Sequence, residues 1–464
     1  MTRLNTVAEI LLPQMLYARF ISSSIAKRLA SGSLWSLFGS ATSRILVLIA
    51  MILVARILGQ VSFGEFGLIQ ATLGVFGILA GVGLGSAATR FVAQYAASDP
   101  DRAGRIIALV SGSSVVTVIF ASTLLIAFSD FLAEQLLGAP HLRVALILGI
   151  LLMATSVFRG IQNGIAAGLE RFDLIAKLNI LDGFFTLPGV FLLARVLGVE
   201  GALLGLALSS LVVWIIGQLM LKEELKARDI KVRYRGAGLD YKILMGYSLP
   251  SLLGSSVTTP ALWGAMTLLA RTEDGFAQLG LYNAAYQWHG PLMFLPMILM
   301  SVSIPVLVQE WESGHHGRFR QIYLSITAFA LLMTLIAAVV LSLTSTWIIG
   351  LYGPEFSDGG FVLILLLAAS SVHAVSKVAI GALYGMNRAW SVFLVNTVWG
   401  ASFLIMSMLW IPKYVAIGLA AAFLLAHLFQ AIIATSLTLG FTAMSISKDQ
   451  DRRQNENNSF DISS

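Results

Sequence analysis

The sequence has no cysteine, and only 12% of its 464 residues are charged. Without cysteine, the chain can form neither disulfides nor cysteine-ligated metal sites. Soluble domains carry about 25% charged residues, and their interiors are too small to hold a chain that is 57% hydrophobic. Lipid accepts such apolar surface, so the sequence predicts an integral membrane protein.

Catalytic motifs are missing as well. The sequence contains no His-Glu-x-x-His metal motif, no Gly-x-Ser-x-Gly nucleophile motif and no phosphate-binding P-loop. The formal charge of +6 comes from basic residues in the loops between apolar runs, which indicates membrane topology rather than nucleic-acid binding. We therefore predict a protein that is not an enzyme and has no cofactor, no metal and no nucleic-acid partner.

Apolar runs long enough to cross a bilayer occur throughout the chain. A spanning helix needs about 20 mostly apolar residues. This length predicts an all-α integral membrane protein with about 12 transmembrane helices. The predicted spans are residues 34–56, 66–89, 105–129, 143–166, 175–196, 200–221, 243–270, 279–305, 322–345, 360–384, 389–411 and 414–440.

Basic residues are distributed unevenly between the two sides of these spans. If the N-terminus is cytoplasmic, 24 of the 30 Lys and Arg residues lie on the cytoplasmic side and five on the other, with Arg44 inside a span. Because cytoplasmic loops are enriched in Lys and Arg, we predict that both termini are cytoplasmic.

The spans divide into two sets of six. The longest internal polar stretch lies at mid-chain, where a linker between two lobes belongs. We predict a cytoplasmic or interfacial segment at 1–33, an N-lobe at 34–221, a basic cytoplasmic linker at 222–242, a C-lobe at 243–440 and a disordered cytoplasmic tail at 441–464.

The two predicted lobes resemble each other in sequence. Identical residues in the two lobes are separated by one constant difference in residue number, which we call the first offset. Further along the chain this difference becomes two residues longer, and we call it the second offset. At the first offset Ala55-Arg56 matches Ala270-Arg271 and Gly138 matches Gly353, and at the second Arg171 matches Arg388 and Asn179 matches Asn396. Chance matches in a biased composition are the alternative. A duplication of six helices gives parallel repeats, which in transporters surround a central substrate path.

Charged residues at membrane depth are expensive and usually face a cavity or a partner. Arg44 lies about ten residues into the first span, or roughly 15 Å at the helical rise. Two roles are open: recognition of an anionic group such as phosphate, or a structural pair with a carboxylate or helix end. Arg56 and Arg271 occupy equivalent outer ends of spans one and seven, either as a cavity rim or as interfacial anchors.

Histidines, one carboxylate and two prolines also fall within spans. His289 stands in a polar and aromatic stretch and is a candidate for substrate binding, whereas His373 and His427 are typical of packed hydrogen-bonding groups. Lys377 and Arg90 have stems long enough to reach the interface. Asp182 is a candidate for a coupling ion or proton, with an interface-near hydrogen-bonding role as the alternative. Pro250 and Pro260 make span seven the candidate hinge, or else a static kink.

Small residues repeat along span four. Gly160, Gly164 and Gly168 are four residues apart, which places them on one helix face. Small residues at this spacing let helices approach closely in membranes, so the repeat predicts a packing interface.

Four segments carry a resemblance to a known family. Residues 53–67 (LVARILGQVSFGEFG), 81–90 (GVGLGSAATR), 168–172 (GLERF) and 279–285 (LGLYNAA) resemble helix ends and connections of polysaccharide-biosynthesis membrane proteins. That family contains the lipid-linked oligosaccharide flippases. It lies in the superfamily that also holds multidrug antiporters and peptidoglycan-precursor flippases.

The resemblance implies two six-helix lobes around a central cavity, alternating access and a place in the cytoplasmic (inner) membrane. It also implies a polyprenyl-diphosphate-linked oligosaccharide as substrate, such as an O-antigen, capsule or exopolysaccharide unit, with a polysaccharide polymerase and glycosyltransferases as partners. Arg44 fits a cationic cavity for the diphosphate, and Arg90 and Arg271 fit it by position. The alternatives are an ion-coupled multidrug antiporter, a peptidoglycan-precursor flippase, and a membrane polymerase or ligase.

Overall fold

The computed structural model describes residues 24–81, 83–241 and 257–461, and these residues form helices joined by short turns. Most of the candidate residues lie within these ranges, but Pro250 lies outside them. The long helices are α3 (Ser24–Gly81), α4 (Leu84–Tyr95), α5 (Pro100–Ala127), α6 (Arg143–Gly168), α7 (Phe172–Ala227), α9 (Thr258–Ala270), α10 (Gly275–Tyr286), α11 (His289–Glu312), α12 (His316–Leu343), α14 (Gly360–Gly385) and α15 (Ala389–Asp461). Short elements are η1 (Phe131–Leu136), η2 (Pro140–Leu142), η3 (Ala237–Asp240), α13 (Ser345–Gly350) and η4 (Pro354–Gly359).

Eight helical segments in the described part of the chain are long and apolar enough to cross a bilayer. Three of the helices in them are pairs whose backbone breaks at a single residue. Gly59 breaks α3, Gly198 breaks α7 and Val415 breaks α15, each at a positive φ. Splitting three of the eight segments gives eleven, and α9 lies in the remaining predicted span, 243–270, so the described residues are consistent with 12 crossings and confirm the helical membrane fold.

Positive φ angles recur at equivalent places in the two halves. At the first offset, Gly59 (φ 74°) matches Asp274 (φ 53°) and Gly138 (φ 66°) matches Gly353 (φ 130°). At the second offset, Glu170 (φ 58°) matches Asn387 (φ 59°) and Gly198 (φ 62°) matches Val415 (φ 42°). Three of these four pairs join different residue types, and non-glycine residues seldom adopt this region, so the three pairs support the duplication independently of residue identity.

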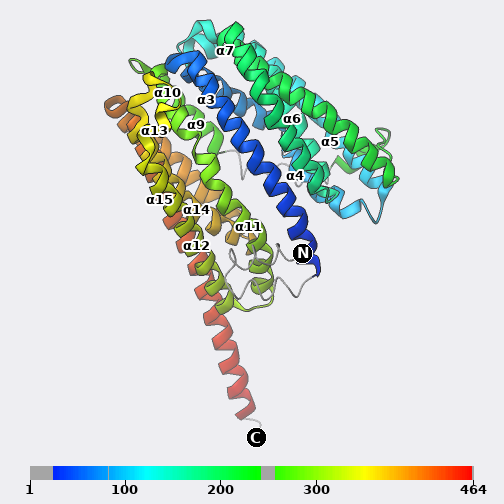
Figure 1. Cartoon of the computed structure of the whole chain (residues 1–464). Coiled ribbons are helices and arrows are strands. Elements are labelled where there is room, and N and C mark those ends of the chain that lie inside the picture. The colour runs from blue at the N-terminus through cyan, green and yellow to red at the C-terminus, as the bar shows by residue number, and fades with distance from the viewer. Residues whose placement is uncertain (1–23, 82, 242–256, 462–464) are drawn as a thin grey trace.

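The helices form two lobes (Figure 1). Helices α3 to α7 make one lobe and α9 to α15 the other, and the start of α3 and the end of α15 point toward the same end of the molecule. One large apolar cluster draws on both lobes, whereas a second belongs to α11, α12, α14 and α15 alone and a third to α6 and α7 alone. The lobes therefore share a core at one end and pack separately toward the other, which we call the terminal end.

The shared end is held by a lobe junction, defined by Phe63, Phe66, Tyr352 and Phe356. Phe63 lies 6.1 Å from the rings of Phe66 and Phe356 and 6.4 Å from Tyr352, and all four residues are buried. Backbone approach is equally close there, because a β-carbon on Gly64 would lie 2.0 Å from the carbonyl oxygen of Phe276. We call this the closed end.

Glycines also bring α4 and α6 together, as the repeat predicts. A β-carbon on Gly164 would lie 2.2 Å from the carbonyl oxygen of Gly85, and the Thr89 hydroxyl donates to the Gly164 carbonyl at 3.1 Å. Gly160 differs, because its β-carbon would meet nothing within 4 Å. Two of the three glycines, Gly164 and Gly168, are thus tightly packed.

Two helix ends lie beyond the predicted lobe boundaries. Helix α7 runs to Ala227, six residues into the predicted linker, and α15 continues through Asp461, where we predicted a disordered tail from residue 441. The tail contains no proline or glycine, so its sequence holds no residue that stops a helix. The first ten residues of α3 likewise belong to the predicted N-terminal segment.

Candidate functional site

Arg44 reaches from one lobe to the other. Its Nη1 donates to the carbonyl oxygen of Gly290 at 3.1 Å, and its guanidinium carbon lies 5.3 Å from the ring centre of Phe294. Gly290 and Phe294 belong to α11, so a cation of α3 rests on the first turns of a C-lobe helix. No carboxylate pairs with Arg44 in the described ranges. Its positive charge faces the carbonyl dipole of Gly290 and the aromatic ring of Phe294 instead.

Three histidines from three helices form a column beside this contact. His289 of α11 lies 5.3 Å from His373 of α14, which lies 4.1 Å from His427 of α15, between ring centres. The column continues through Tyr286 at one end and Trp399 at the other, at 5.4 Å and 5.2 Å. Only His289 was predicted as a site residue, and the structure places it in a larger cluster whose middle ring is His373.

The hydrogen bonds of this column indicate which imidazole nitrogens donate and which accept. The Ser370 hydroxyl donates to the Leu366 carbonyl at 2.7 Å, so its oxygen accepts from His289 Nδ1 at 2.7 Å. In a neutral imidazole the other nitrogen is then an acceptor, and His373 Nδ1 lies 3.3 Å from His289 Nε2 as its donor. His427 is fixed separately, with Nδ1 3.0 Å from Gln430 Oε1.

The column forms one wall of a cavity of about 370 Å³, which we call the C-lobe cavity. Its volume falls in the range of small-molecule sites. The described residues that line it combine aromatic rings, amides, hydroxyls and a single formal charge, that of Lys377, and none of them is Asp or Glu. They include Thr258, Thr259, Tyr286, His289, His373, Lys377, Asn396, Trp399, Phe423, His427 and Gln430.

Lys377 lies about eight residues from the end of α14, or roughly 12 Å at the helical rise. We predicted that its side chain reaches the interface, but it lines the C-lobe cavity, where it is exposed. No carboxylate of the described residues forms an ion pair with it. Together with Arg44 next to His289, it makes this region cationic.

The N-lobe contains a second cavity of different chemistry, of about 610 Å³. It lies where α3 ends and α4 begins, and α6 forms the opposite wall. Apart from Gln70 and Ser156 its lining is apolar or glycine, including Gly77, Gly81, Gly83, Gly85, Gly160, Leu84, Leu152, Met153, Val157 and Ile161. The two lobes thus repeat a backbone plan but present an apolar and a polar cavity.

Asp182, the candidate coupling residue, forms an ion pair with Arg159 between α7 and α6. Both side chains are largely buried, with exposed fractions of 23% and 16%. This contact gives Asp182 a structural use, and it holds the Arg159 guanidinium inside the N-lobe.

Replacing Asp182 with asparagine is expected to destabilise the protein by about 1–3 kcal/mol, because Arg159 loses its counter-charge in a largely buried place. Thermal unfolding in detergent measures this effect. The double variant Arg159→Gln/Asp182→Asn should recover most of the loss, since it leaves no unpaired charge. If Asp182→Asn instead keeps full stability and removes the pH dependence of transport, Asp182 is the coupling residue and the structural role is wrong.

The other predicted site residues lie apart from the C-lobe cavity. Arg90 is exposed on α4, 5.8 Å from the ring of Phe91, and Arg271 is exposed at the C-terminal cap of α9. Pro260 is the third residue of α9, where a helix tolerates a missing N–H. Arg56, at the closed end, donates to the Leu351 carbonyl of the other lobe at 2.6 Å. A role for Arg90 and Arg271 in binding stays a prediction.

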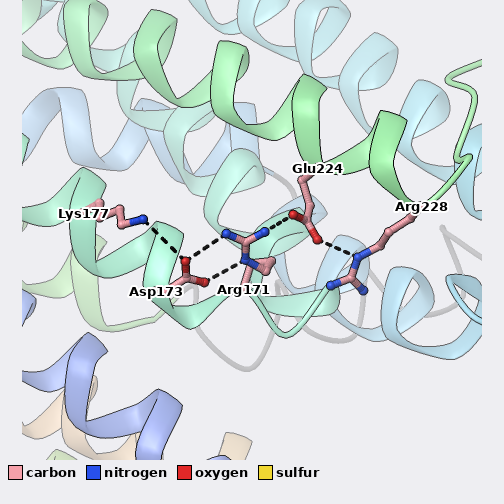
Figure 2. A network of polar contacts seen from close by, with 5 residues as sticks. All are labelled: Arg171, Asp173, Lys177, Glu224 and Arg228. Atoms are coloured by element: carbon pink, nitrogen blue, oxygen red, sulfur yellow. Dashed lines mark hydrogen bonds and ion pairs between the residues drawn. The ribbon is translucent and has the colours of Figure 1, made fainter.

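A polar network fixes the two ends of α7 at the terminal end (Figure 2). Arg171 binds both carboxylate oxygens of Asp173, at 2.7 Å and 2.9 Å, and Glu224 at the far end of the same helix pair. Arg228 also binds Glu224, at 2.7 Å. The hydrogen bond to Asp173 raises the pKa of Arg171, so this cation stays charged.

The C-lobe has the equivalent of this contact in another form. At the second offset Arg171 matches Arg388 and Glu224 matches Phe441. Arg388 lies 4.4 Å from the ring centre of Phe441. An ion pair in one lobe is replaced by a cation–π contact in the other.

Residues 29–311 match the family of polysaccharide biosynthesis proteins, and this match covers more than half of the chain. The chain belongs to the polysaccharide biosynthesis protein family. Over 425 residues it is 24% identical to the EPS I polysaccharide export inner membrane protein EpsE of Ralstonia nicotianae, covering 87% of this chain and 92% of that protein. Over 273 residues it is 29% identical to the lipid III flippase of Escherichia coli, covering 55% of this chain and 61% of that one.

Solved structures give the same fold for this family member. An inward-facing multidrug resistance transporter of the MATE family in the MOP superfamily aligns with a TM-score of 0.75 at 15% identity. The alignment covers 87% of this chain and 96% of that one. The resemblance seen in the sequence, to polysaccharide-biosynthesis membrane proteins, is confirmed, as is a multi-pass helical membrane fold.

Proposed function

We propose that this protein is a flippase that moves a polyprenyl-diphosphate-linked oligosaccharide across the cytoplasmic membrane by alternating access. The observation that carries the proposal is the cationic contact between the lobes, where Arg44 touches α11 beside the C-lobe cavity. The relatives support it, because one is named as a polysaccharide export protein and another as a lipid III flippase. A diphosphate suits Arg44, since a guanidinium donates two parallel hydrogen bonds to phosphate oxygens.

The packing of the lobes supports a state that opens toward the cytoplasm. The lobe junction holds the closed end, while the clusters at the terminal end are separate in the two lobes. Because Lys and Arg are concentrated on the side of the termini, the positive-inside rule places the terminal end in the cytoplasm. A substrate made in the cytoplasm would enter there and leave after the lobes rock to open the closed end.

The second candidate is a multidrug antiporter, which the MATE fold allows. Drug–cation exchange of this kind needs a carboxylate in the binding region. The residues lining the C-lobe cavity include none, and Asp182 is paired with Arg159. The cationic lining favours an anionic substrate over a cationic drug.

Arg44→Ala tests the site. In proteoliposomes we expect it to slow transfer of a fluorescent prenyl-diphosphate-linked oligosaccharide roughly 10- to 100-fold, the effect of losing a charged hydrogen bond of about 1.5–3 kcal/mol. Arg195→Ala is the matched control, since Arg195 is an exposed arginine that stacks on Phe191 of its own helix. Unchanged transfer by folded Arg44→Ala protein removes Arg44 from the mechanism, and no transfer by the wild type removes the proposed function.

A further inference from the structure

We propose that the C-lobe cavity is the subsite for one sugar of the carried oligosaccharide, and that it selects a sugar bearing a negative charge. This inference rests on the proposed function and names a feature of its substrate. The two cavities differ in chemistry: the N-lobe cavity has Gln70 and Ser156 as its polar lining residues, whereas the C-lobe cavity combines a lysine, histidines, amides and hydroxyls.

The lining of the cavity matches the two faces of a sugar ring. The C–H face of a sugar is apolar, and the half-buried Tyr286 lines the cavity with the buried rings of Trp399 and Phe423 behind it, which makes this part of the wall apolar. The hydroxyls of a sugar both donate and accept, and the half-buried Asn396 carries an amide that does both, with buried Gln430 behind it. Gln430 Nε2 donates to Asn396 Oδ1 at 3.1 Å, which holds the two amides in one orientation.

Lys377 supplies the charge selectivity. Lys377 is an exposed residue that lines the cavity, no described lining residue is a carboxylate, and no described carboxylate forms an ion pair with it. His289 bonds to Ser370 and lies 3.3 Å from His373 Nδ1 through its Nε2, and imidazoles add no negative charge to the cavity. A carboxylate on the bound sugar would therefore be the missing counter-charge of Lys377, whereas a neutral sugar leaves the ammonium uncompensated.

Position links this subsite to the proposed diphosphate site. Arg44 donates to Gly290, the residue that follows His289 in the cavity wall. A headgroup whose diphosphate rests on Arg44 would extend its sugars toward the histidine column. The cavity volume of about 370 Å³ suits one or two sugar rings rather than a long chain.

The experiment measures the binding of two short-chain prenyl-diphosphate sugars to the purified full-length protein. One carries glucuronic acid and the other glucose, and bare prenyl diphosphate is the third probe. We expect the wild type to bind the glucuronic acid probe roughly 10- to 100-fold more tightly than the glucose probe. Lys377→Gln should remove this preference while leaving the affinity for bare prenyl diphosphate unchanged.

Two further variants keep the test decisive. Lys413→Gln, which removes a lysine that stacks on the neighbouring Tyr414 ring, should retain the preference. Asn396→Asp places a carboxylate in the cavity with almost no change of shape and should reverse the preference toward glucose, even if Lys377→Gln fails to fold.

Three outcomes overturn the subsite. They are equal binding of both sugars by the wild type, equal weakening of all three probes by Lys377→Gln, which would make Lys377 a diphosphate ligand, and an unaltered preference in Asn396→Asp. Failure of the wild type to bind bare prenyl diphosphate would instead count against the proposed function.

Discussion

Replacing Gly64 with valine is expected to abolish transport while both lobes stay folded. Even a β-carbon at this position would lie 2.0 Å from the Phe276 carbonyl oxygen, and 2.9 Å from the carbonyl carbon, so the backbones of α3 and α10 must separate. If this overpacking costs about 3 kcal/mol, the population of the state with the closed end shut falls roughly 100-fold. A transporter that cannot shut one side cannot alternate.

The absence of cysteine makes the separation measurable, because spin labels attach only to cysteines that are introduced. A pair at exposed Val61 and Trp347 reports on the closed end, and a pair at Lys226 and Trp390 reports on the terminal end. In Gly64→Val we expect a longer distance for the first pair and a shorter one for the second. Gly440→Val is the matched control, because a β-carbon there meets nothing within 4 Å.

An unchanged pair of distances in transport-deficient Gly64→Val would contradict this account. The loss of transport would then come from something other than the contact between the lobes. Full transport in Gly64→Val would contradict it more directly, since the close approach of α3 and α10 would not be required.

Alanine at Gly164 and at Gly160 is expected to have effects of opposite sign, although the two glycines are one helical turn apart. At Gly164 the new methyl group would lie 2.2 Å from the Gly85 carbonyl oxygen, so α4 and α6 must move apart. We expect a loss of about 1–3 kcal/mol in unfolding free energy from overpacking. At Gly160 the methyl group meets no atom within 4 Å, and alanine in a helix gains about 0.5–1 kcal/mol over glycine.

Thermal unfolding of the two purified variants in the same detergent measures this difference. Gly160→Ala should unfold at or above the wild-type temperature and Gly164→Ala well below it. Equal melting temperatures would mean that α4 and α6 are not held by this contact. A lower melting temperature for Gly160→Ala alone would reverse the assignment of the packed glycine.

The sequence was sufficient to predict the helical membrane fold. Each span can be identified from the length of its own apolar run and from the charges of the loops next to it, without knowledge of contacts with other helices. The identities at the first and second offsets predicted two lobes, and the repeated positive φ angles follow the same offsets. Lipid-facing and core-facing sides of a helix are both apolar, however, so the sequence did not distinguish Gly160, which faces a cavity, from Gly164, which packs.

The candidate site was predicted only in part, because it depends on contacts between distant segments. Arg44 and His289 were identified as polar groups at membrane depth, but the column needs His373 and His427, which lie on two later helices far along the chain from His289. Lys377 was misjudged because distance from the helix end was used without knowing which face of α14 borders a cavity. Lys377 follows His373 by about one helical turn, which places both on one helix face, and this spacing was the available signal.

The matched turns of the two lobes have a consequence for how proteins of this kind change over time. Gly198 and Val415 bend their helices at the same point of each copy, while the cavity of one copy is lined mainly by apolar residues and that of the other by polar ones. In the function we propose, the bends determine how the lobes rock and the cavity walls determine what is carried. Substitutions in the C-lobe wall can therefore retune the cargo during evolution without altering the mechanical cycle.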